Sequence, residues 1–432
     1  MGNYPTYKKY KQTRCAWLQE IPEHWDFKRL KNVASHNDEA LDERTDPDLE
    51  IEYVDISSVS LVNGIEKTEA MPFEKAPSRA RRKVKDGDII VSTVRTYLKA
   101  IAPICEPSEN MVVSTGFAVI RPKENLLSGF AGYLLQSNGF VGDVVANSVG
   151  VSYPAINASD LVRIPAVEPP LEEQKAIARF LDFKTAQIDA LIAKKKALLD
   201  KLAEKRTALI SHAVTKGLDP SVPMKESGVE WLGKIPKGWK SISVRWLIRV
   251  GSGDFISNTD TEFDCSDEAP VPVVGGNGVM AYTNQVNTQN DCIVIGRVGA
   301  HCGNVHFIKA PSWITDNALR VKIISDDISA EFLICALKAI GLNDFANKNA
   351  QPLITGEMVK SKDIALPPMT DQIEICRHID KIEAHIKSQT EKTQLAIDKL
   401  REYRGALITN AVIGKIDVRG FQVPKLNAEV AL

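Results

Sequence analysis

The chain has 432 residues, of which 44% are hydrophobic and 25% are charged, and its formal net charge at pH 7 is −1. This composition is typical of globular domains and excludes a disordered or strongly cationic protein, so any nucleic-acid-binding surface must be local. The seven cysteines show no paired spacing, which favours a reducing compartment over a disulfide framework. Because no apolar run could cross a bilayer and the start is polar, we expect a cytoplasmic protein without a membrane partner.

The first half of the chain predicts a polar N-terminal segment at 1–24 and then a globular part at 25–168. β-Branched composition and neighbouring Asn-Gly and Asp-Gly turns predict strands at 51–56, 88–94 and 117–121. A helix near 130–137 and an irregular loop at 148–156 follow. The first globule is therefore expected to be an α/β mixture.

A long amphipathic helix is predicted next, within a first spacer at 169–216. No glycine or proline interrupts it from Leu171 to Lys216. Two heptad positions carry its apolar side chains, with Leu181, Ile188, Leu202 and Leu209 on one and Ile177, Leu191 and Leu198 on the other. A helix of this length extends roughly 65 Å at about 1.5 Å per residue, so it is suited to act as a spacer.

The second half of the chain repeats this plan, with a connector at 217–238, a globule at 239–366, a second spacer helix at 367–413 and a tail at 414–432. A helix is predicted at 330–340, and a tight turn at the glycine-rich segment 275–278. Strands are predicted at 271–274, 292–296, 305–308 and 318–324.

The two halves are related by a tandem duplication. The segment Trp-Leu-x-x-Ile-Pro-x-x-Trp at 17–25 recurs at 231–239, and Pro-x-x-x-Gln at 170–174 recurs at 368–372. Within the helices the correspondence continues without a gap. Because a two-fold relation places equal faces opposite each other, we expect the two helices to pair as an antiparallel coiled coil inside one chain.

The order of these parts resembles the specificity subunits of type I restriction–modification enzymes. The likeness covers nearly the whole chain and is carried by the repeated tryptophan segments, the Pro-Pro openings of the spacer helices, the helix endings Arg206–Ile210 and Arg404–Ile408, and the glycine motifs at 274–278 and 295–299. The resemblance implies two target recognition domains, each reading one half of a bipartite, asymmetric sequence in double-stranded DNA. It also implies that the paired helices hold the half-sites at a fixed separation and bind two copies of a methyltransferase subunit, which a restriction subunit with translocase activity joins.

Candidate DNA contacts are polar or cationic side chains on loops, because base edges are read by few such groups and glycine turns allow close backbone approach. In the first globule a basic run leads into the strand at 88–94, and the candidates are Arg81, Arg82, Lys83, Arg95, Lys99, Ser148, Ser152 and Tyr153. In the second globule they are Asn277, Arg297, His301, Asn304, Lys348, Asn349 and Gln351.

No catalytic or metal site is expected on this chain. It lacks a phosphate-loop motif, an amino-methyltransferase signature and a dinucleotide-binding glycine motif, and His301, Cys302 and His306 offer no nearby fourth zinc ligand. The resemblance places S-adenosylmethionine on the methyltransferase subunits, and ATP and Mg²⁺ on the restriction subunit. Three alternatives remain at this point: a related bipartite-site system with a fused methyltransferase–nuclease partner, a coiled-coil scaffold that does not touch DNA, and an enzyme with two degenerate catalytic globules.

Overall fold

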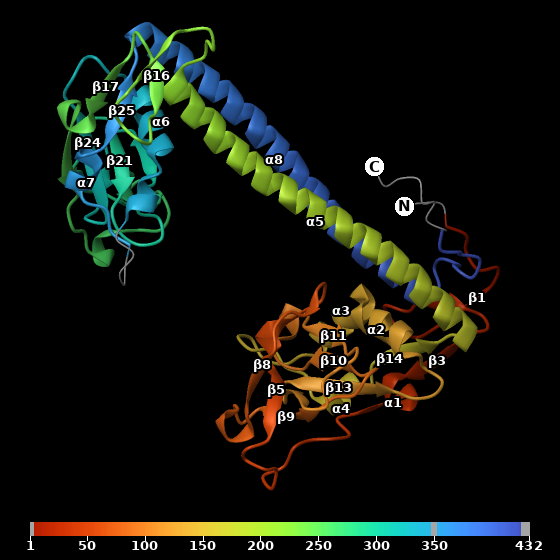
Figure 1. Cartoon of the computed structure of the whole chain (residues 1–432). Helices are drawn as coiled ribbons and strands as arrows, with labels where there is room; N and C mark the ends of the chain where they lie inside the picture. Colours follow the sequence, from red (N-terminus) through yellow and green to blue (C-terminus); the bar gives the residue numbers. More distant parts are fainter. Residues whose placement is uncertain (1–3, 347–351, 425–432) are drawn as a thin grey trace. The chain divides into compact units, whose positions relative to one another are not determined.

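The computed structural model describes residues 4–346 and 352–424, and it divides into two compact units (Figure 1). The first unit comprises Met1–Lys195 and Leu395–Leu432, and the second comprises Lys196–Gln394. Each unit holds one globule and a stretch of both long helices, α5 (Leu171–Lys216) and α8 (Met369–Val412). In the described part of the chain, none of the helices combines the length and apolarity needed to cross a membrane.

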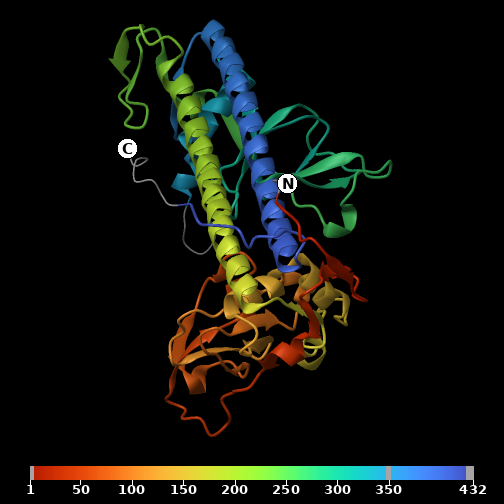
Figure 2. The ribbon, with the colours of Figure 1, turned by 90° about the vertical axis from the view of Figure 1, so that its right-hand side faces the viewer.

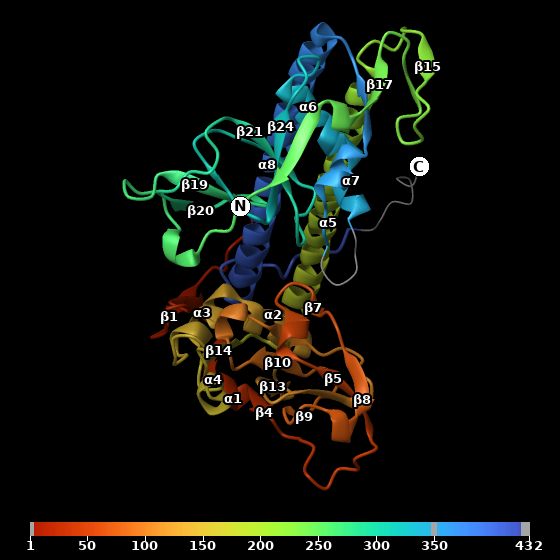
Figure 3. The same ribbon diagram turned by 90° about the vertical axis from the view of Figure 1, so that its left-hand side faces the viewer.

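The first globule is built on two four-stranded sheets (Figure 3). The first sheet is antiparallel and has the order β11 (Ile101–Pro103), β10 (Ile89–Ser92), β13 (Phe117–Pro122), β4 (Ala34–His36). The second has the order β8 (Glu69–Pro72), β5 (Glu50–Val54), β12 (Met111–Ser114), β9 (Ala80–Lys83), with β5 and β12 parallel. The strands predicted at 51–56, 88–94 and 117–121 are thereby confirmed as β5, β10 and β13.

The second globule repeats this topology. Its larger sheet has the order β18 (Ile248–Ser252), β24 (Ala318–Ile323), β21 (Cys292–Gly296), β22 (Val305–Ile308). Its smaller sheet has the order β20 (Gly278–Thr283), β19 (Val271–Gly275), β23 (Trp313–Ile314), and β19 again pairs with its later neighbour in parallel. All four predicted strands are confirmed. Among the described strands of the second globule, none corresponds to β9, so that strand is an addition to the first.

Short elements complete each globule. The helices of the first are α1 (Leu30–Val33), α2 (Ser128–Gln136), α3 (Asn138–Ala146) and α4 (Ala158–Leu161), and those of the second are α6 (Ala330–Ile340) and α7 (Gly356–Lys360). Two-stranded pairs form between β3 (Asp26–Arg29) and β14 (Pro165–Glu168) and between β17 (Lys240–Ser243) and β25 (Asp363–Leu366). Hairpins form from β1 (Tyr10–Gln12) with β2 (Glu20–Pro22), β6 (Val59–Ser60) with β7 (Gly64–Ile65), and β15 (Met224–Glu226) with β16 (Lys234–Pro236).

Within each unit the two long helices pack side by side and antiparallel (Figures 1 and 2). In the first unit the Nε of Arg404 donates to the Oδ1 of Asp189 at 3.0 Å, and in the second Arg206 pairs with Glu383. The later residue of α8, Arg404, therefore pairs with the earlier residue of α5, Asp189. This order confirms the predicted antiparallel pair. The buried side chains include Ile177, Leu181, Ile188, Ile192, Leu202, Ile210, Ile375, Ile379, Ile386, Ile397 and Leu407.

One part of the predicted heptad pattern is wrong. The side chains of Leu191 and Leu198 are 43% and 44% exposed, although both were expected in the contact between the helices. Ile192, one position after Leu191, is buried instead. The physical reason is that two helices alone bury only a narrow stripe, and its position drifts around a helix whose period is near 3.6 rather than 3.5 residues.

Equivalent buried contacts join each globule to its spacer helix and explain the duplicated motifs. The side chain of Gln174 is fully buried, accepts a hydrogen bond from the Leu127 amide at 2.8 Å and donates to two backbone carbonyls. Gln372 does the same with the Ser329 amide. The indole of Trp25 donates to Glu173 at 2.9 Å, and the indole of its duplicate Trp239 donates to Asp371 at 3.2 Å. These tryptophans therefore belong to the junction between globule and helix.

Candidate nucleic-acid interface

In the first globule, the segment that follows β10 is hydrogen-bonded to the loop that precedes α4. The Ile156 amide donates to the Thr93 carbonyl at 2.9 Å, and the hydroxyl oxygens of Thr96 and Ser148 lie 2.8 Å apart. The loop is itself a narrow hairpin, because Val149 and Ala155 exchange two backbone hydrogen bonds of 2.8 and 3.0 Å. The two candidate segments of the first globule, remote in sequence, therefore form one surface.

A hollow of about 530 Å³ opens at this surface and is lined by Arg79, Val94, Arg95, Thr115, Gly116 and Tyr153. The guanidinium of Arg95 lies 5.0 Å from the centroid of the exposed Tyr153 ring, at a distance suited to a cation–π contact. Arg95 and Lys99 have positive φ angles of 52° and 53°, a left-handed conformation that is costly for side chains of this kind. Such local strain persists when the surrounding structure holds it, and it is common at functional sites.

The basic run of the first globule divides between the hollow and the added strand β9. Its first member, Arg79, lines the hollow, although its place there could not be foreseen from a charge run alone. Arg81 stacks on the Phe73 ring at 4.6 Å, Arg82 is half-buried, and Lys83 is exposed at the end of β9. Burial lowers the pKa of Arg82. None of these three residues lines the hollow. Arg81, Arg82 and Lys83 stay predictions as DNA contacts.

In the second globule, the segment after β21 is bonded to the loop before α7 in the same way. The Ile354 amide donates to the Arg297 carbonyl at 2.8 Å, and the Gly299 amide donates to the Pro352 carbonyl at 3.0 Å. The Arg297 guanidinium donates to the Ser252 hydroxyl at 3.2 Å and to the Asp316 carbonyl at 3.4 Å. Thr93 and Arg297 thus occupy equivalent places, since each accepts from an isoleucine that follows the partner loop.

Asn277 and Asn304, two further candidates of the second globule, lie at its glycine turn. A Cβ added at Gly296 would lie 2.6 Å from the Gly276 carbonyl oxygen, so the two backbones approach more closely than any side chain would allow. This contact brings Asn277 beside Asn304, whose amide nitrogen lies 3.4 Å from the Asn277 amide oxygen. His301 is exposed nearby in sequence. Lys348, Asn349 and Gln351 lie outside the described residues.

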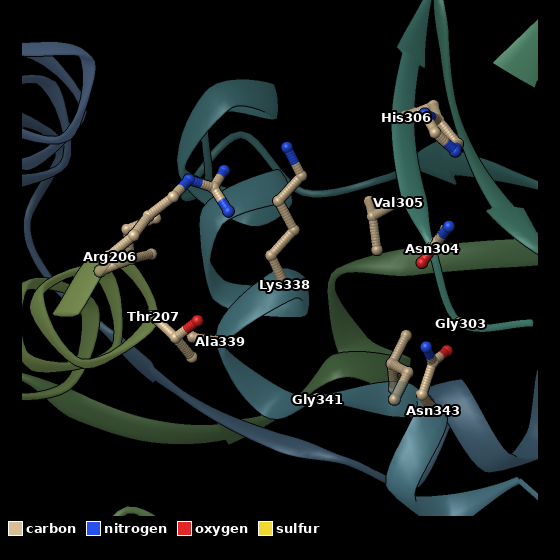
Figure 4. A pocket seen from close by; sticks show the side chains of 12 residues that line it. Arg206, Thr207, Gly303, Asn304, Val305, His306, Lys338, Ala339, Gly341 and Asn343 are labelled. Carbon is tan, nitrogen blue, oxygen red and sulfur yellow. The ribbon is translucent and has the colours of Figure 1, made fainter. Parts of the chain in front are cut away.

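A second cavity lies in this unit where α5, α6 and β22 meet, and its volume is about 380 Å³ (Figure 4). The side chains of Arg206 and Lys338 extend into it, while Asn304 and His306 stand on the opposite wall. Burial lowers the pKa of His306, which favours its neutral form near pH 7. Residues of α5 and of the globule line this cavity together, and Arg206 is already paired with Glu383 of the other long helix. We therefore assign the cavity to the junction between globule and helix.

Residues 4–346 and 352–424 contain no group of three or more histidine, cysteine, aspartate or glutamate side chains that could hold a metal ion. The features present are polar loops, stacked arginine and close backbone turns. These features suit the recognition of a ligand more than chemistry upon it.

The fold and these loops define a protein with two equivalent recognition globules mounted on paired helices. A family model described as the type I restriction modification DNA specificity domain matches residues 22–201 and 236–397. The chain belongs to this family, whose members confer DNA specificity and are not themselves the catalytic subunits.

Similar proteins carry the same assignment. The EcoprrI specificity subunit of Escherichia coli is 31% identical over 149 residues, which are 34% of this chain and 37% of that protein. The EcoKI specificity subunit of Escherichia coli K12 is 23% identical over 322 residues, which are 69% of this chain and 68% of that protein. The first match thus spans little more than a third of the relative's length.

Solved structures share the fold. A chain from work on complex assembly and conformational transition of the type I R-M system has a TM-score of 0.72, with 21% identity, and covers 92% of this chain and 99% of that chain. The HsdS subunit from Thermoanaerobacter tengcongensis has a TM-score of 0.50, also with 21% identity, and covers 92% of this chain and 98% of that chain. At this identity the likeness concerns architecture alone.

Proposed function

We propose that this specificity subunit reads a bipartite, asymmetric sequence in double-stranded DNA, with one half-site for each globule. The observation that carries the proposal is the equivalent pair of loops, at 93–99 with 148–156 in the first globule and at 297–304 with 352–354 in the second. The backbone hydrogen bonds of the two loop pairs match, but the side chains differ, since Thr93 occupies the position that is equivalent to Arg297. Equal frames with unequal side chains favour two different half-sites.

The same proposal assigns functional boundaries. The target recognition domains are 25–168 and 239–366, and the spacers at 169–216 and 367–413 hold the half-sites apart. The DNA contacts that we propose are those predicted from the sequence, and the hollow adds Arg79 to them because it shares that surface with Arg95 and Tyr153.

We further propose that two copies of a methyltransferase subunit dock on the spacer helices and that a restriction and translocase subunit joins them in the cytoplasm. The exposed leucines of these helices support this, because Leu191, Leu198 and Leu395 are 43%, 44% and 55% exposed. Apolar side chains left open on a helix pair are suited to further helix packing. S-adenosylmethionine would bind to the methyltransferase subunits, and ATP and Mg²⁺ to the restriction subunit.

The decisive experiment is methylome sequencing of a host that carries the chain with its methyltransferase partner. We expect one bipartite motif with two unlike halves. Exchange of 239–366 for the corresponding segment of another family member should then change one half and leave the other unchanged. Alteration of both halves, or methylation without any motif, would refute independent reading. The neighbouring open reading frames distinguish separate partners from a fused methyltransferase–nuclease.

A further inference from the structure

Five large apolar side chains are exposed together at the surface of the first globule. Tyr97 and Leu98 belong to a short 3-10 turn after β10, and Val149, Val151 and Tyr153 belong to the hairpin before α4. The Val151 side chain is 101% exposed and that of Val149 is 81% exposed. We call these five residues the apolar tip. An apolar patch of this kind on a folded domain marks a surface that a ligand covers.

The charge around the apolar tip specifies the kind of ligand. Arg79, Arg95 and Lys99 are exposed beside it, and the segments 93–99 and 148–156 contain no acidic residue. A ligand with negative charge outside and flat apolar faces inside fits this arrangement. Nucleic acid has this character, because its phosphates surround stacked bases.

Backbone hydrogen bonds brace the apolar tip. The hairpin is closed by the paired backbone of Val149 and Ala155, and the Thr96 amide donates to the Pro154 carbonyl at 3.4 Å. Gly150 has a φ of 111°, and a Cβ there would lie 3.2 Å from the Tyr153 carbonyl oxygen, so the turn requires glycine. A projecting apolar group that is braced in this way loses less conformational freedom on binding than an unbraced loop would.

We propose that the apolar tip is a wedge that enters the DNA between adjacent base pairs of one half-site and unstacks them. Val151 and Leu98 fill the gap, Tyr153 and Tyr97 stack on the freed base faces, and the neighbouring cations hold the phosphates on either side. This inference rests on the proposed function, because it assumes that the first globule contacts DNA. It adds a physical basis of specificity, since base steps that unstack easily would be preferred without any hydrogen bond to them.

The test places 2-aminopurine, which brightens on unstacking, at successive positions of the half-site assigned to the first globule. The position of the methylated base is left out, so that base extrusion by the methyltransferase does not contribute. Full-length chain with its methyltransferase partner is titrated onto each duplex, and both fluorescence and affinity are measured. We expect emission to rise several-fold at one step.

The wedge variant carries Leu98→Ser and Val151→Ser, at residues that are 46% and 101% exposed. We expect it to lose the emission rise and to bind about tenfold more weakly. Val62→Ser is the matched control, because Val62 is 47% exposed in the same globule but lies outside the apolar tip. The control should retain both the emission rise and the affinity.

The outcomes separate the wedge from the proposed function. Sequence-specific binding by the wild-type complex without an emission rise at any position overturns the wedge and leaves DNA reading intact. An emission rise that survives in the wedge variant also overturns it. If the wild-type complex bound the motif found by methylome sequencing no more tightly than other DNA, both the proposed function and the wedge would be refuted.

Discussion

Gln372 offers a quantitative test of how the second globule is fixed to its spacer helix. Its side chain is fully buried and makes three hydrogen bonds, of 2.8, 2.7 and 3.0 Å, with the backbone of Ser329, Asp327 and Pro367. Gln372→Ala would leave one amide and two carbonyls without these partners. At about 1 kcal/mol net for each bond, we expect the free energy of unfolding to fall by about 3 kcal/mol. That is a large fraction of the roughly 5–15 kcal/mol that a typical domain has.

The assay is urea unfolding followed by circular dichroism, with separate fits if the two units unfold separately. Gln389→Ala on the same helix is the matched control, because Gln389 is exposed and its replacement should change stability by less than about 0.5 kcal/mol. Gln174→Ala should produce a similar loss in the other unit, and the two losses should add. If Gln372→Ala lowered the free energy of unfolding no more than Gln389→Ala, the buried hydrogen bonds of Gln372 would not be what holds the globule to the helix.

Three further predictions concern function. Arg95→Ala and Arg297→Ala should each weaken one half-site only, by about 1–3 kcal/mol for a bidentate base contact, and unchanged affinity and motif would remove that arginine from the interface. The purified chain alone should transfer no methyl group and cut no DNA, so robust methylation without a partner would contradict the assignment. Insertion of four helical residues after Lys196 should lengthen α5 by about 6 Å, so methylome sequencing should show unchanged half-sites with a spacer longer by about one or two base pairs. An unchanged spacer in a folded, active variant would mean that the helices do not set it.

The fold was predictable where a segment carries its own pattern. Helix α5 contains no glycine or proline, α8 contains one glycine, Gly405, and the strands β10 and β21 are rich in β-branched residues. The pairing of β5 with β12, in contrast, joins residues about sixty positions apart in parallel, and no local pattern specifies a partner at that distance. Strand β9 could be predicted only as a basic run, because its arginines and lysine mask any alternation of apolar and polar residues.

The sequence was enough to predict which segments carry the candidate DNA contacts, but not that these segments lie together on one surface. The loops around Arg95 and Tyr153 were identified by residue type, and the structure shows the guanidinium over the ring. Arg79 could not be ranked above its neighbours, because only the pairing of β9 with β12 places it beside Thr115 at the hollow. The sequence gives no signal for Val151, because a valine in a loop carries no polar group and its exposure is a property of the folded hairpin.

The ends of the two long helices give a last prediction, in which two glycines one position out of register in the repeat differ in the cost of their replacement. Gly217 after α5 and Gly414 after α8 have φ angles of 80° and 75°, and each faces the tryptophan of its junction. A Cβ at Gly217 would lie 3.3 Å from Trp239, whereas at Gly414 it would lie 2.5 Å from the Pro22 ring and 3.0 Å from Trp25. The left-handed conformation should cost about 1–2 kcal/mol in either alanine variant, and the rigid proline ring should add about 1–3 kcal/mol at Gly414 alone. Urea unfolding of Gly217→Ala and Gly414→Ala should therefore show the larger loss for Gly414→Ala, and equal losses would show that the segment after α8 yields freely against the N-terminal hairpin.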